Sequence, residues 1–351
     1  MKLPSQETLA STLHNPCYFL SMIPFKNNHL LHRAIPKSKY CTLFVLATLL
    51  SSCAAWDQLL CAPHNKKAEE PFPESELTTC ISSDTSWANH PVFCIGTDRS
   101  NPPVILLHEL PGLSPKTLQY AKTLSKDFYV YVPLLYGKPN QQSTLRGALA
   151  FHTNGEWQAR PELNGSSRIV KWLQYVTTQV QLNHPTQTIG VIGNCMTGTV
   201  PLALLDNPSV TAAVLAQPTP PLPLFYYSHE DKYSLAISES ELAKAVTRKD
   251  VRIYFVRFET DCVSLPEKKA SLKAHFGNRL IDGEITKLEY INPLECNCQR
   301  VHSTLIGEWG SRDHIGDASE NRREEIRQFL LNPANYEPQR LSYTKKVSSA
   351  N

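Results

Sequence analysis

Residues 188–198 read TIGVIGNCMTG and decide the fold of this chain. The β-branched, apolar run predicts a strand, and the glycine-flanked turn after it predicts a sharp reversal into a helix with Cys195 at the tip. The pattern is that of a nucleophile elbow, G-x-S-x-G, with cysteine in place of serine and one extra residue before the second glycine. A helix N-terminus behind the tip favours a thiolate, so Cys195 is the candidate nucleophile. The alternative is a small buried cysteine in an ordinary strand–helix turn.

The candidate acid is Asp261, because elbows of this kind occur in α/β-hydrolase triads with the chain order nucleophile, acid, base. Residues 251–258 (VRIYFVRF) predict a strand, and Asp261 follows it at the edge where open α/β sheets carry their functional groups. Glu259 is the alternative acid. The non-catalytic interpretation of Asp261 is a turn or helix-entry residue ahead of Pro266.

The candidate base is His302, which follows a strand that we predict over residues 286–291 (TKLEYI). His314 is the competing histidine, because it also precedes the final helix. It lies in the polar run 310–317 (GSRDHIGD), which predicts a surface loop, and so His302 is preferred.

Residues 104–112 (VILLHELPG) contain a second functional signal. An apolar strand ends in a polar pair and a Pro-Gly turn, and a helix is expected over residues 115–128. In this fold the loop after that strand supplies one backbone N–H of the oxyanion hole, and the residue after the nucleophile supplies the other. The expected donors are Leu110 and Met196. An ordinary strand–helix loop is the alternative interpretation.

Together these segments resemble the dienelactone hydrolase family of α/β-hydrolases, over roughly residues 91–331. The motifs that carry the resemblance are HELPG at 108–112, YVPLLYG at 131–137, GNCMTG at 193–198, Asp261, and the pair His302-Ser303. The resemblance implies Cys195 as nucleophile, Asp261 as orienting acid and His302 as base. It also implies a role for Glu109, whose carboxylate approaches the resting cysteine and helps to hold the thiol protonated. Substrate binding then ends this restraint, and the thiol is activated.

One feature of the family's lactone-cleaving members is missing here. Those members hold a substrate carboxylate with arginines, one of them four residues after the catalytic histidine, where this chain has Ile306. Arg146 and Arg257 are the candidates to replace it. We expect cleavage of a carboxylic ester or lactone whose identity the sequence leaves open. The alternatives are a non-catalytic or an acyl-transferring lipoprotein that retains the fold.

The chain alternates strands and helices, which predicts an α/β fold with a mostly parallel sheet covered by helices on both faces. The expected strands lie near 91–96, 104–108, 129–134, 188–193, 212–217, 251–258 and 285–291, and the expected helices near 115–127, 166–180, 197–206, 239–248, 266–276 and 318–331. The hydrolase domain is expected over 78–332, with a loose tail at 333–351. A net charge of +3 and the lack of a basic stripe interleaved with aromatics exclude nucleic acid as an expected partner.

The N-terminal segment predicts export. Basic residues precede the apolar run 41–50 (CTLFVLATLL), which is too short to span a bilayer and typical of a signal-peptide core. The following LSSC resembles a bacterial lipobox, which makes Cys53 the lipidated first mature residue. We therefore expect a signal peptide within 1–52, a tether over 53–77, and a lipid-anchored protein of the bacterial cell envelope, facing the periplasm or the exterior. Met22 is an alternative start to Met1.

Export changes the expected state of the ten cysteines. Cys17 and Cys41 leave with the predicted signal peptide, and Cys53 and Cys195 have other expected roles. The six cysteines that remain are Cys61, Cys80, Cys94, Cys262, Cys296 and Cys298. An oxidising compartment favours disulfides among them, and Cys80–Cys94 is the leading pair because both lie near the first strands. The Cys-x-Cys pair at 296–298 lacks the second pair of a metal site, so no metal or cofactor is expected.

Overall fold

The computed structural model describes residues 69–81, 88, 90–219, 229–261, 263–290, 301–307 and 314–338. They all lie in one of the chain's two compact units, Asp57–Asn351, whereas the other, Met1–Trp56, falls outside the described ranges. The expected signal peptide, Cys53 and the Cys-x-Cys pair fall outside them as well.

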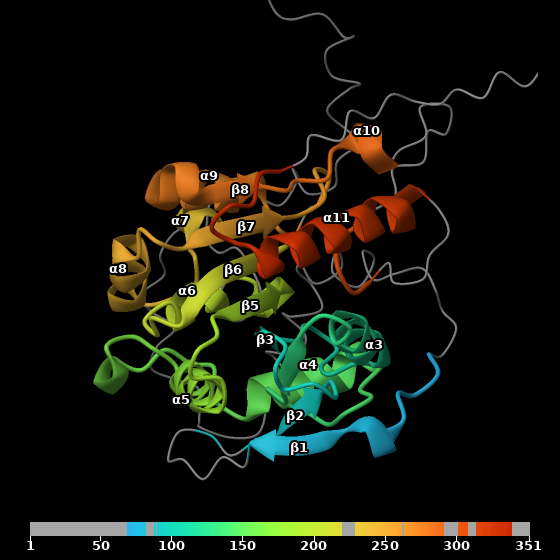
Figure 1. Ribbon diagram of the computed structural model, residues 1–351. Coiled ribbons are helices and arrows are strands. Elements are labelled where there is room, and N and C mark those ends of the chain that lie inside the picture. Colours follow the sequence, from blue (N-terminus) through green and yellow to red (C-terminus); the bar gives the residue numbers. More distant parts are fainter. Residues whose placement is uncertain are drawn as a thin grey trace, which may run out of the picture. The chain divides into compact units, whose positions relative to one another are not determined.

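An eight-stranded sheet forms the centre of the second unit, in the order β1-β2-β4-β3-β5-β6-β7-β8 (Figure 1). The strands are β1 (Thr78–Ile81), β2 (Val92–Ile95), β3 (Pro103–Leu106), β4 (Tyr129–Pro133), β5 (Ile189–Asn194), β6 (Val210–Ala216), β7 (Arg252–Val256) and β8 (Leu280–Asp282). From β4 to β8 all neighbours pair in parallel, and only β1–β2 and β2–β4 are antiparallel. The α/β-hydrolase fold expected from the sequence is therefore confirmed.

Helices cover both faces of this sheet. They are α3 (Pro115–Leu124), α4 (Thr144–Thr153), α5 (Arg168–Asn183), α6 (Val200–Leu204), α7 (His229–Tyr233), α8 (Glu239–Thr247), α9 (Pro266–Phe276), α10 (Lys287–Tyr290) and α11 (His314–Leu331), with single 3₁₀ turns at Glu74–Glu76, Pro161–Leu163, Cys195–Thr197 and Gly277–Arg279. Side chains of α5, α6, α8 and α9 pack into one buried cluster, and those of α3 and α11 into a second one. Two cores on opposite faces explain why the central strands are almost wholly apolar.

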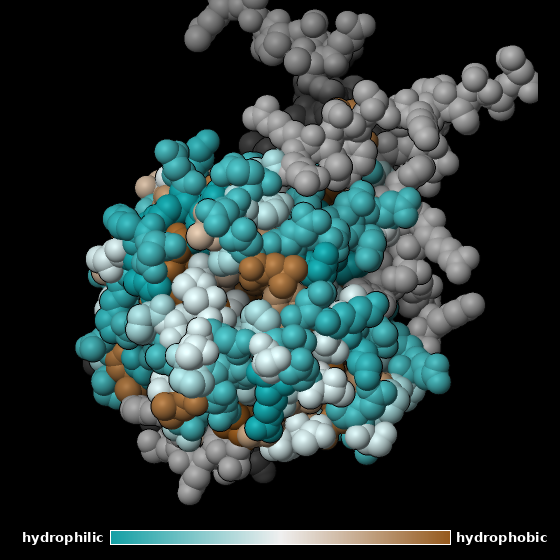
Figure 2. Space-filling view, viewed as in Figure 1, coloured by the Kyte–Doolittle hydropathy of each residue, from teal (hydrophilic) through white to brown (hydrophobic). Residues whose placement is uncertain are grey.

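The surface in view is mostly hydrophilic, with apolar side chains in small patches (Figure 2). The large apolar side chains that remain exposed are Leu149, Leu182, Tyr233, Leu288 and Leu331. Within the part of the chain that the structure describes, no helix is both long and apolar enough to cross a membrane.

The strand predicted over 286–291 is wrong. Lys287–Tyr290 forms the short helix α10, and the eighth strand is Leu280–Asp282, which pairs in parallel with β7. Thr286 begins the helix, because its backbone N–H and hydroxyl both donate to the Glu289 carboxylate, as in an N-terminal cap. Leu288 is 89% exposed, so the alternating pattern of this segment does not bury an apolar face.

Further elements differ from the prediction. Strand β1 and helix α4 were not expected, nor was the short helix α7. Helix α11 begins at His314, four residues before the expected start of the last helix. The side chain of His314 lies outside the described residues.

The disulfide Cys80–Cys94 joins β1 to β2, which confirms the leading pair. It fastens the short edge strand to the rest of the sheet. The other four cysteines of the expected oxidised set lie outside the described residues.

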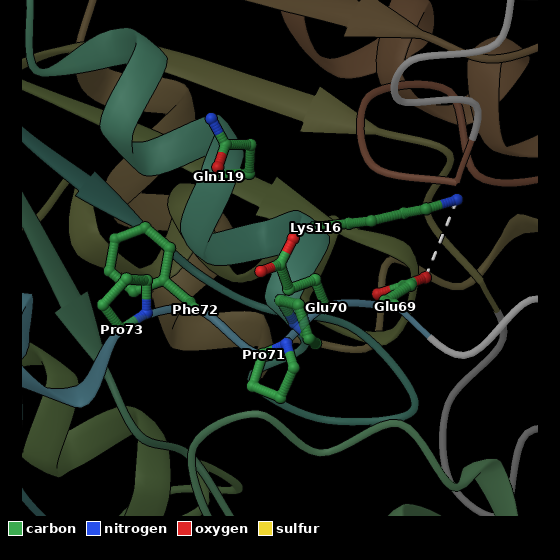
Figure 3. A pocket seen from close by; sticks show the side chains of 8 residues that line it. Glu69, Glu70, Pro71, Phe72, Pro73, Lys116 and Gln119 are labelled. Carbon is green, nitrogen blue, oxygen red and sulfur yellow. Dashed lines mark ion pairs between the residues drawn. The ribbon is translucent and has the colours of Figure 1, made fainter.

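Residues on both sides of the expected domain also pack onto it. The Asn140 side chain pairs with the backbone N–H and C=O of Phe72, and Gln142 does the same for Glu69. Residues 69–73 thus lie against α3 and enclose, with Lys116, a hollow of about 360 Å³ (Figure 3). At the other end Tyr336 is buried, and its carbonyl accepts a hydrogen bond from Arg252.

Candidate active site

The Cys195 turn has the geometry of an elbow. Cys195 directly follows β5 as the first residue of the 3₁₀ turn, with φ at +52° and 3% of its surface exposed. A Cβ on Gly193 would lie 2.2 Å from the Thr197 carbonyl oxygen, and one on Gly198 would lie 2.6 Å from Cα of Pro218. Only glycine fits at these two close approaches.

Hydrogen bonds between near neighbours close this turn. The Asn194 N–H donates to Thr197 Oγ1 at 2.9 Å, and the Thr197 hydroxyl lies 2.9 Å from the Asn194 carbonyl oxygen. The Asn194 side-chain amide donates to the Leu107 carbonyl at 2.9 Å, which joins the turn to the end of β3. The turn is thereby fixed to the sheet at the point where Cys195 leaves it.

The structure brings Cys195, Asp261 and His302 together. His302 Nδ1 lies 2.8 Å from Asp261 Oδ2, and His302 Nε2 lies 3.2 Å from Cys195 Sγ. The three residues are buried and come from three separate segments at the carboxyl ends of the parallel strands. The other Asp261 oxygen accepts the backbone N–H groups of Val263 and Ser264, at 2.8 and 2.9 Å, so both oxygens of the carboxylate have partners.

The alternative acid, Glu259, points elsewhere. It is exposed, and its carboxylate accepts the backbone N–H of Lys287 at 2.8 Å, at the start of α10. Of the two candidate acids, Asp261 is the one that contacts the His302 imidazole.

The charges around His302 favour its protonated form. Burial by itself lowers the pKa of this imidazole, but the Asp261 carboxylate and the Cys195 sulfur outweigh it and raise the pKa well above its ordinary value of 6.5. A protonated imidazole next to sulfur favours the thiolate. The contact between Cys195 and His302 is therefore suited to a thiolate–imidazolium pair.

Glu109 lies in the same buried region and pairs with side chains from two other segments. One oxygen accepts the Ser303 hydroxyl, and the other accepts the Gln217 side-chain amide at 3.0 Å. Burial raises the pKa of Glu109, against the effect of these hydrogen bonds and of His302. In this arrangement the sulfur of Cys195 contacts the imidazole, while Glu109 is held on Ser303 and Gln217.

The loop after β3 carries the expected oxyanion donor Leu110, followed by a cis peptide bond to Pro111. Burial lowers the pKa of His108 to about 3, so its ring is neutral, and Nε2 accepts the Leu135 N–H at 2.9 Å. The Tyr136 hydroxyl donates to the Glu109 carbonyl at 2.9 Å and lies 3.4 Å from Met196 Sδ. Tyr136 thus joins the two segments that carry Leu110 and Met196.

The segment with His302 is held by side chains from distant parts of the chain. Thr304 donates its N–H and its hydroxyl to the Gln217 side-chain oxygen, and the Gly307 N–H donates to Ser303 Oγ. Lys116, on α3, donates to the Gly307 carbonyl at 2.8 Å and lies 3.7 Å from Glu69. The proline-rich stretch that begins at Gln217 is a candidate lining of the pocket mouth from the sequence, with a stiff surface loop as the alternative. The contacts of the Gln217 and Lys116 side chains with the His302 segment were not predicted, because the chain shows no local pattern that connects them.

The positions weighed for substrate binding have other roles in the structure. Ile306, where the family has an arginine, is buried in the second apolar core. Arg257 is buried in the turn that carries Asp261 and is hydrogen-bonded to backbone carbonyls there. Arg146 is exposed on α4. Among the residues that the structure describes, no group of three or more His, Cys, Asp or Glu side chains is placed to hold a metal.

The molecule is thus a protein of α/β-hydrolase fold, with a thiol, an imidazole and a carboxylate in contact at the carboxyl edge of its sheet. Residues 92–253 match the model of the dienelactone hydrolase family. The match includes Glu109 and Cys195 and ends before Asp261 and His302. The assignment of these last two residues therefore depends on their geometry.

Solved structures to which this chain is similar include a protein from Klebsiella pneumoniae described as a dienelactone hydrolase, which is 14% identical, with a TM-score of 0.49 over 72% of this chain and 97% of its own. Est1E from Butyrivibrio proteoclasticus is 11% identical, with a TM-score of 0.41 over 72% and 98% of the two chains. A serine hydrolase without a lid from Xanthomonas campestris is 10% identical, with a TM-score of 0.43 over 77% and 100%. No curated protein matches the chain.

Proposed function

We propose that this protein is a thiol hydrolase that cleaves a carboxylic ester or lactone with Cys195, His302 and Asp261. The observation that carries the proposal is the position of His302, whose two ring nitrogens lie 3.2 Å from the Cys195 sulfur and 2.8 Å from the Asp261 carboxylate. A nucleophile, a base and a group that orients the base are the parts that acyl transfer needs.

The reaction follows from these contacts. The Cys195 thiolate attacks the ester carbonyl carbon, and the N–H groups of Leu110 and Met196 stabilise the oxyanion, each by about 3 kcal/mol in comparable sites. The intermediate collapses to a thioester, and protonated His302 gives its proton to the departing alcohol oxygen. Neutral His302 then takes a proton from water, which attacks the thioester and releases the acid and the thiol. Asp261 keeps the Nδ1–H of His302 in place throughout.

Glu109 is proposed to control the charge on the thiol. Its carboxylate lies in the same buried region as Cys195 and His302, and a negative charge there opposes formation of a thiolate. Its two oxygens are held by hydrogen bonds from Ser303 and Gln217. A substrate that favours this position would leave the thiolate–imidazolium pair free to react.

We also propose that the protein is exported and anchored through a lipid on Cys53. The Cys80–Cys94 disulfide supports export, because disulfides persist mainly in oxidising compartments. Metabolic labelling with a radioactive fatty acid in a bacterial host tests the anchor. Label in the full chain that is lost in Cys53→Ala supports it, and equal label in both proteins contradicts it.

The test of the proposed activity is hydrolysis of p-nitrophenyl acetate by the full chain and by three variants. Cys195→Ala and His302→Gln should each reduce the rate by at least about 10³-fold, while His275→Gln, which changes an exposed histidine on α9, should match the wild type. Circular dichroism checks that all four proteins are folded. Hydrolysis that survives in Cys195→Ala would contradict the proposal. Transfer of the acetyl group to an added alcohol in place of water would indicate an acyltransferase.

A further inference from the structure

Arg257 is a buried cation in contact with the turn that carries Asp261. It follows β7 directly, is 2% exposed, and directs its guanidinium into the bend of residues 259–264. The Nη1 group donates to the carbonyls of Asp261 and Ser264, and Nη2 donates to the carbonyl of Glu259 at 3.0 Å. Three carbonyls of one short turn therefore accept hydrogen bonds from the same guanidinium group.

The same turn presents its N–H groups to the carboxylate of Asp261. Asp261 Oδ1 accepts from Val263 and Ser264, and its own carbonyl accepts from Arg257 at 3.2 Å. Two charged groups thus hold the turn: the carboxylate accepts hydrogen bonds from its N–H groups, and the guanidinium donates hydrogen bonds to its carbonyls. Removal of the guanidinium would leave buried carbonyls without donors, which costs free energy unless the turn rearranges.

An ion pair also holds the Nε group of Arg257. Its Nε lies 2.8 Å from Glu284 Oε1, and the other Glu284 oxygen lies 2.6 Å from Lys269 on α9. The Arg257 side chain is buried and Glu284 is part-buried, so removal of Glu284 would leave a buried cation without its counter-charge, which costs free energy. The guanidinium is thereby locked in one orientation by a residue that follows β8.

We propose that Arg257 is a positioning residue that fixes the Asp261 carboxylate and, through it, the Nδ1–H of His302. Its donors are directed at three carbonyls and one carboxylate of the protein, so it is not the arginine that holds a substrate carboxylate. Its effect on turnover rests on the proposed hydrolase function. Its effect on the reactivity of Cys195 towards an alkylating reagent does not.

The test compares Arg257→Gln, Arg257→Lys and Glu284→Gln with the wild type. Arg248→Gln is the matched control, because Arg248 also donates to several backbone carbonyls of one turn, in a different part of the chain from Asp261. Its acceptors are the carbonyls of Leu205, Asn207, Pro208 and Val210. Two quantities are measured for each full chain: the pH dependence of Cys195 alkylation by iodoacetamide, and kcat and KM for p-nitrophenyl acetate.

Arg257→Gln should reduce kcat by about 10²-fold with KM nearly unchanged, because a loosened Asp261 misplaces the base without touching the substrate. The midpoint of the alkylation profile should move to higher pH, since a poorly held Asp261 stabilises the imidazolium and its thiolate less. Among the described residues, the titratable groups that face Cys195 and His302 are Asp261, Glu109 and Tyr136. None of these is altered by the variants.

Arg257→Lys restores the charge but not the fork of donors, so it should lie between the wild type and Arg257→Gln. Glu284→Gln should shift the profile in the same direction by less. If Arg257→Gln fails to fold, these two variants carry the test. Arg248→Gln should lower the melting temperature and leave the profile unchanged, which separates positioning from general stability.

Unchanged alkylation profiles and unchanged kcat in folded Arg257→Lys and Glu284→Gln would overturn the proposal while leaving the hydrolase function intact. A wild-type protein without hydrolytic activity, whose alkylation profile still shifts in the Arg257 variants, would support the positioning role and contradict the proposed reaction. A rise in KM with kcat unchanged would instead show that Arg257 binds substrate.

Discussion

The Cys195 turn and the His302 segment meet at one contact but are built in opposite ways. The turn is closed by Asn194 and Thr197, three residues apart, and by glycines that leave room for a close approach. The segment with His302 depends on partners 87 to 194 residues away, through Gln217, Glu109 and Lys116. Contacts within the turn thus shape the backbone that carries the sulfur, and one hydrogen bond from Asn194 to Leu107 joins that turn to β3. Distant partners hold the segment with the imidazole, which predicts that different kinds of substitution disrupt the two.

The largest effect is expected from Gly193→Ala in the Cys195 turn. The new Cβ would lie 2.2 Å from a backbone oxygen of Thr197, so the turn must shift, at a cost of about 3 kcal/mol in the free energy of unfolding. Gly190→Ala on the same strand is the control, since its Cβ meets the flexible end of Leu330. Urea unfolding measures both, and equal stabilities would show that sterics do not fix the turn.

A smaller effect is expected from Gln217→Ala, which removes the partner shared by Glu109 and Thr304. Glu109 loses one hydrogen bond and Thr304 loses two, all of them buried, so we expect a loss of about 2 kcal/mol in stability and a rate reduced by about tenfold. Gln187→Ala, which removes a glutamine bridging His184 and Ser100 near β5, serves as the control. An unchanged rate in Gln217→Ala would mean that His302 is held by other contacts.

Lys116→Met tests the outer support of the His302 segment. It deletes the hydrogen bond to the Gly307 carbonyl and the ion pair with Glu69, with an expected loss of about 1 kcal/mol. Lys122→Met, on the same helix, deletes an exposed pair with Glu76 and should cost less than about 0.5 kcal/mol. Thermal unfolding of the two variants distinguishes them, and a reversed order would contradict the account.

The smallest effect is expected from Glu109→Gln and depends on pH. Burial raises the pKa of Glu109 in the folded protein above its ordinary value of 4.5, so the folded state holds this proton more tightly than the unfolded chain. Stability from this group is therefore complete below pH 4.5 and declines as pH rises through the folded pKa. Glutamine does not titrate, so the variant should gain stability relative to the wild type as the pH rises above 4.5. Parallel stability curves would show that the carboxylate is not disfavoured by burial.

The same contrast explains how much the sequence predicts. The elbow, the strands from β2 to β7 and the disulfide are predicted from short-range patterns, because apolar runs and glycine-flanked turns act locally. The strand predicted over 286–291 does not form, because the Glu289 carboxylate accepts a hydrogen bond from the Thr286 N–H. This local bond favours the start of a helix over the strand that the alternating pattern predicts. The role of Arg257 in the Asp261 turn could not be predicted, since it depends on carbonyls that face inward only after folding.

The most direct test of the central claim is to detect the acyl group on Cys195. The full chain is mixed with p-nitrophenyl butyrate, quenched in acid within seconds, and analysed by intact and peptide mass spectrometry, with His302→Gln beside it to slow release. The account predicts one butyryl group per chain, located on Cys195 and removed by hydroxylamine. Hydrolysis of the ester with no adduct on Cys195, and with the same rate in Cys195→Ala, would contradict it.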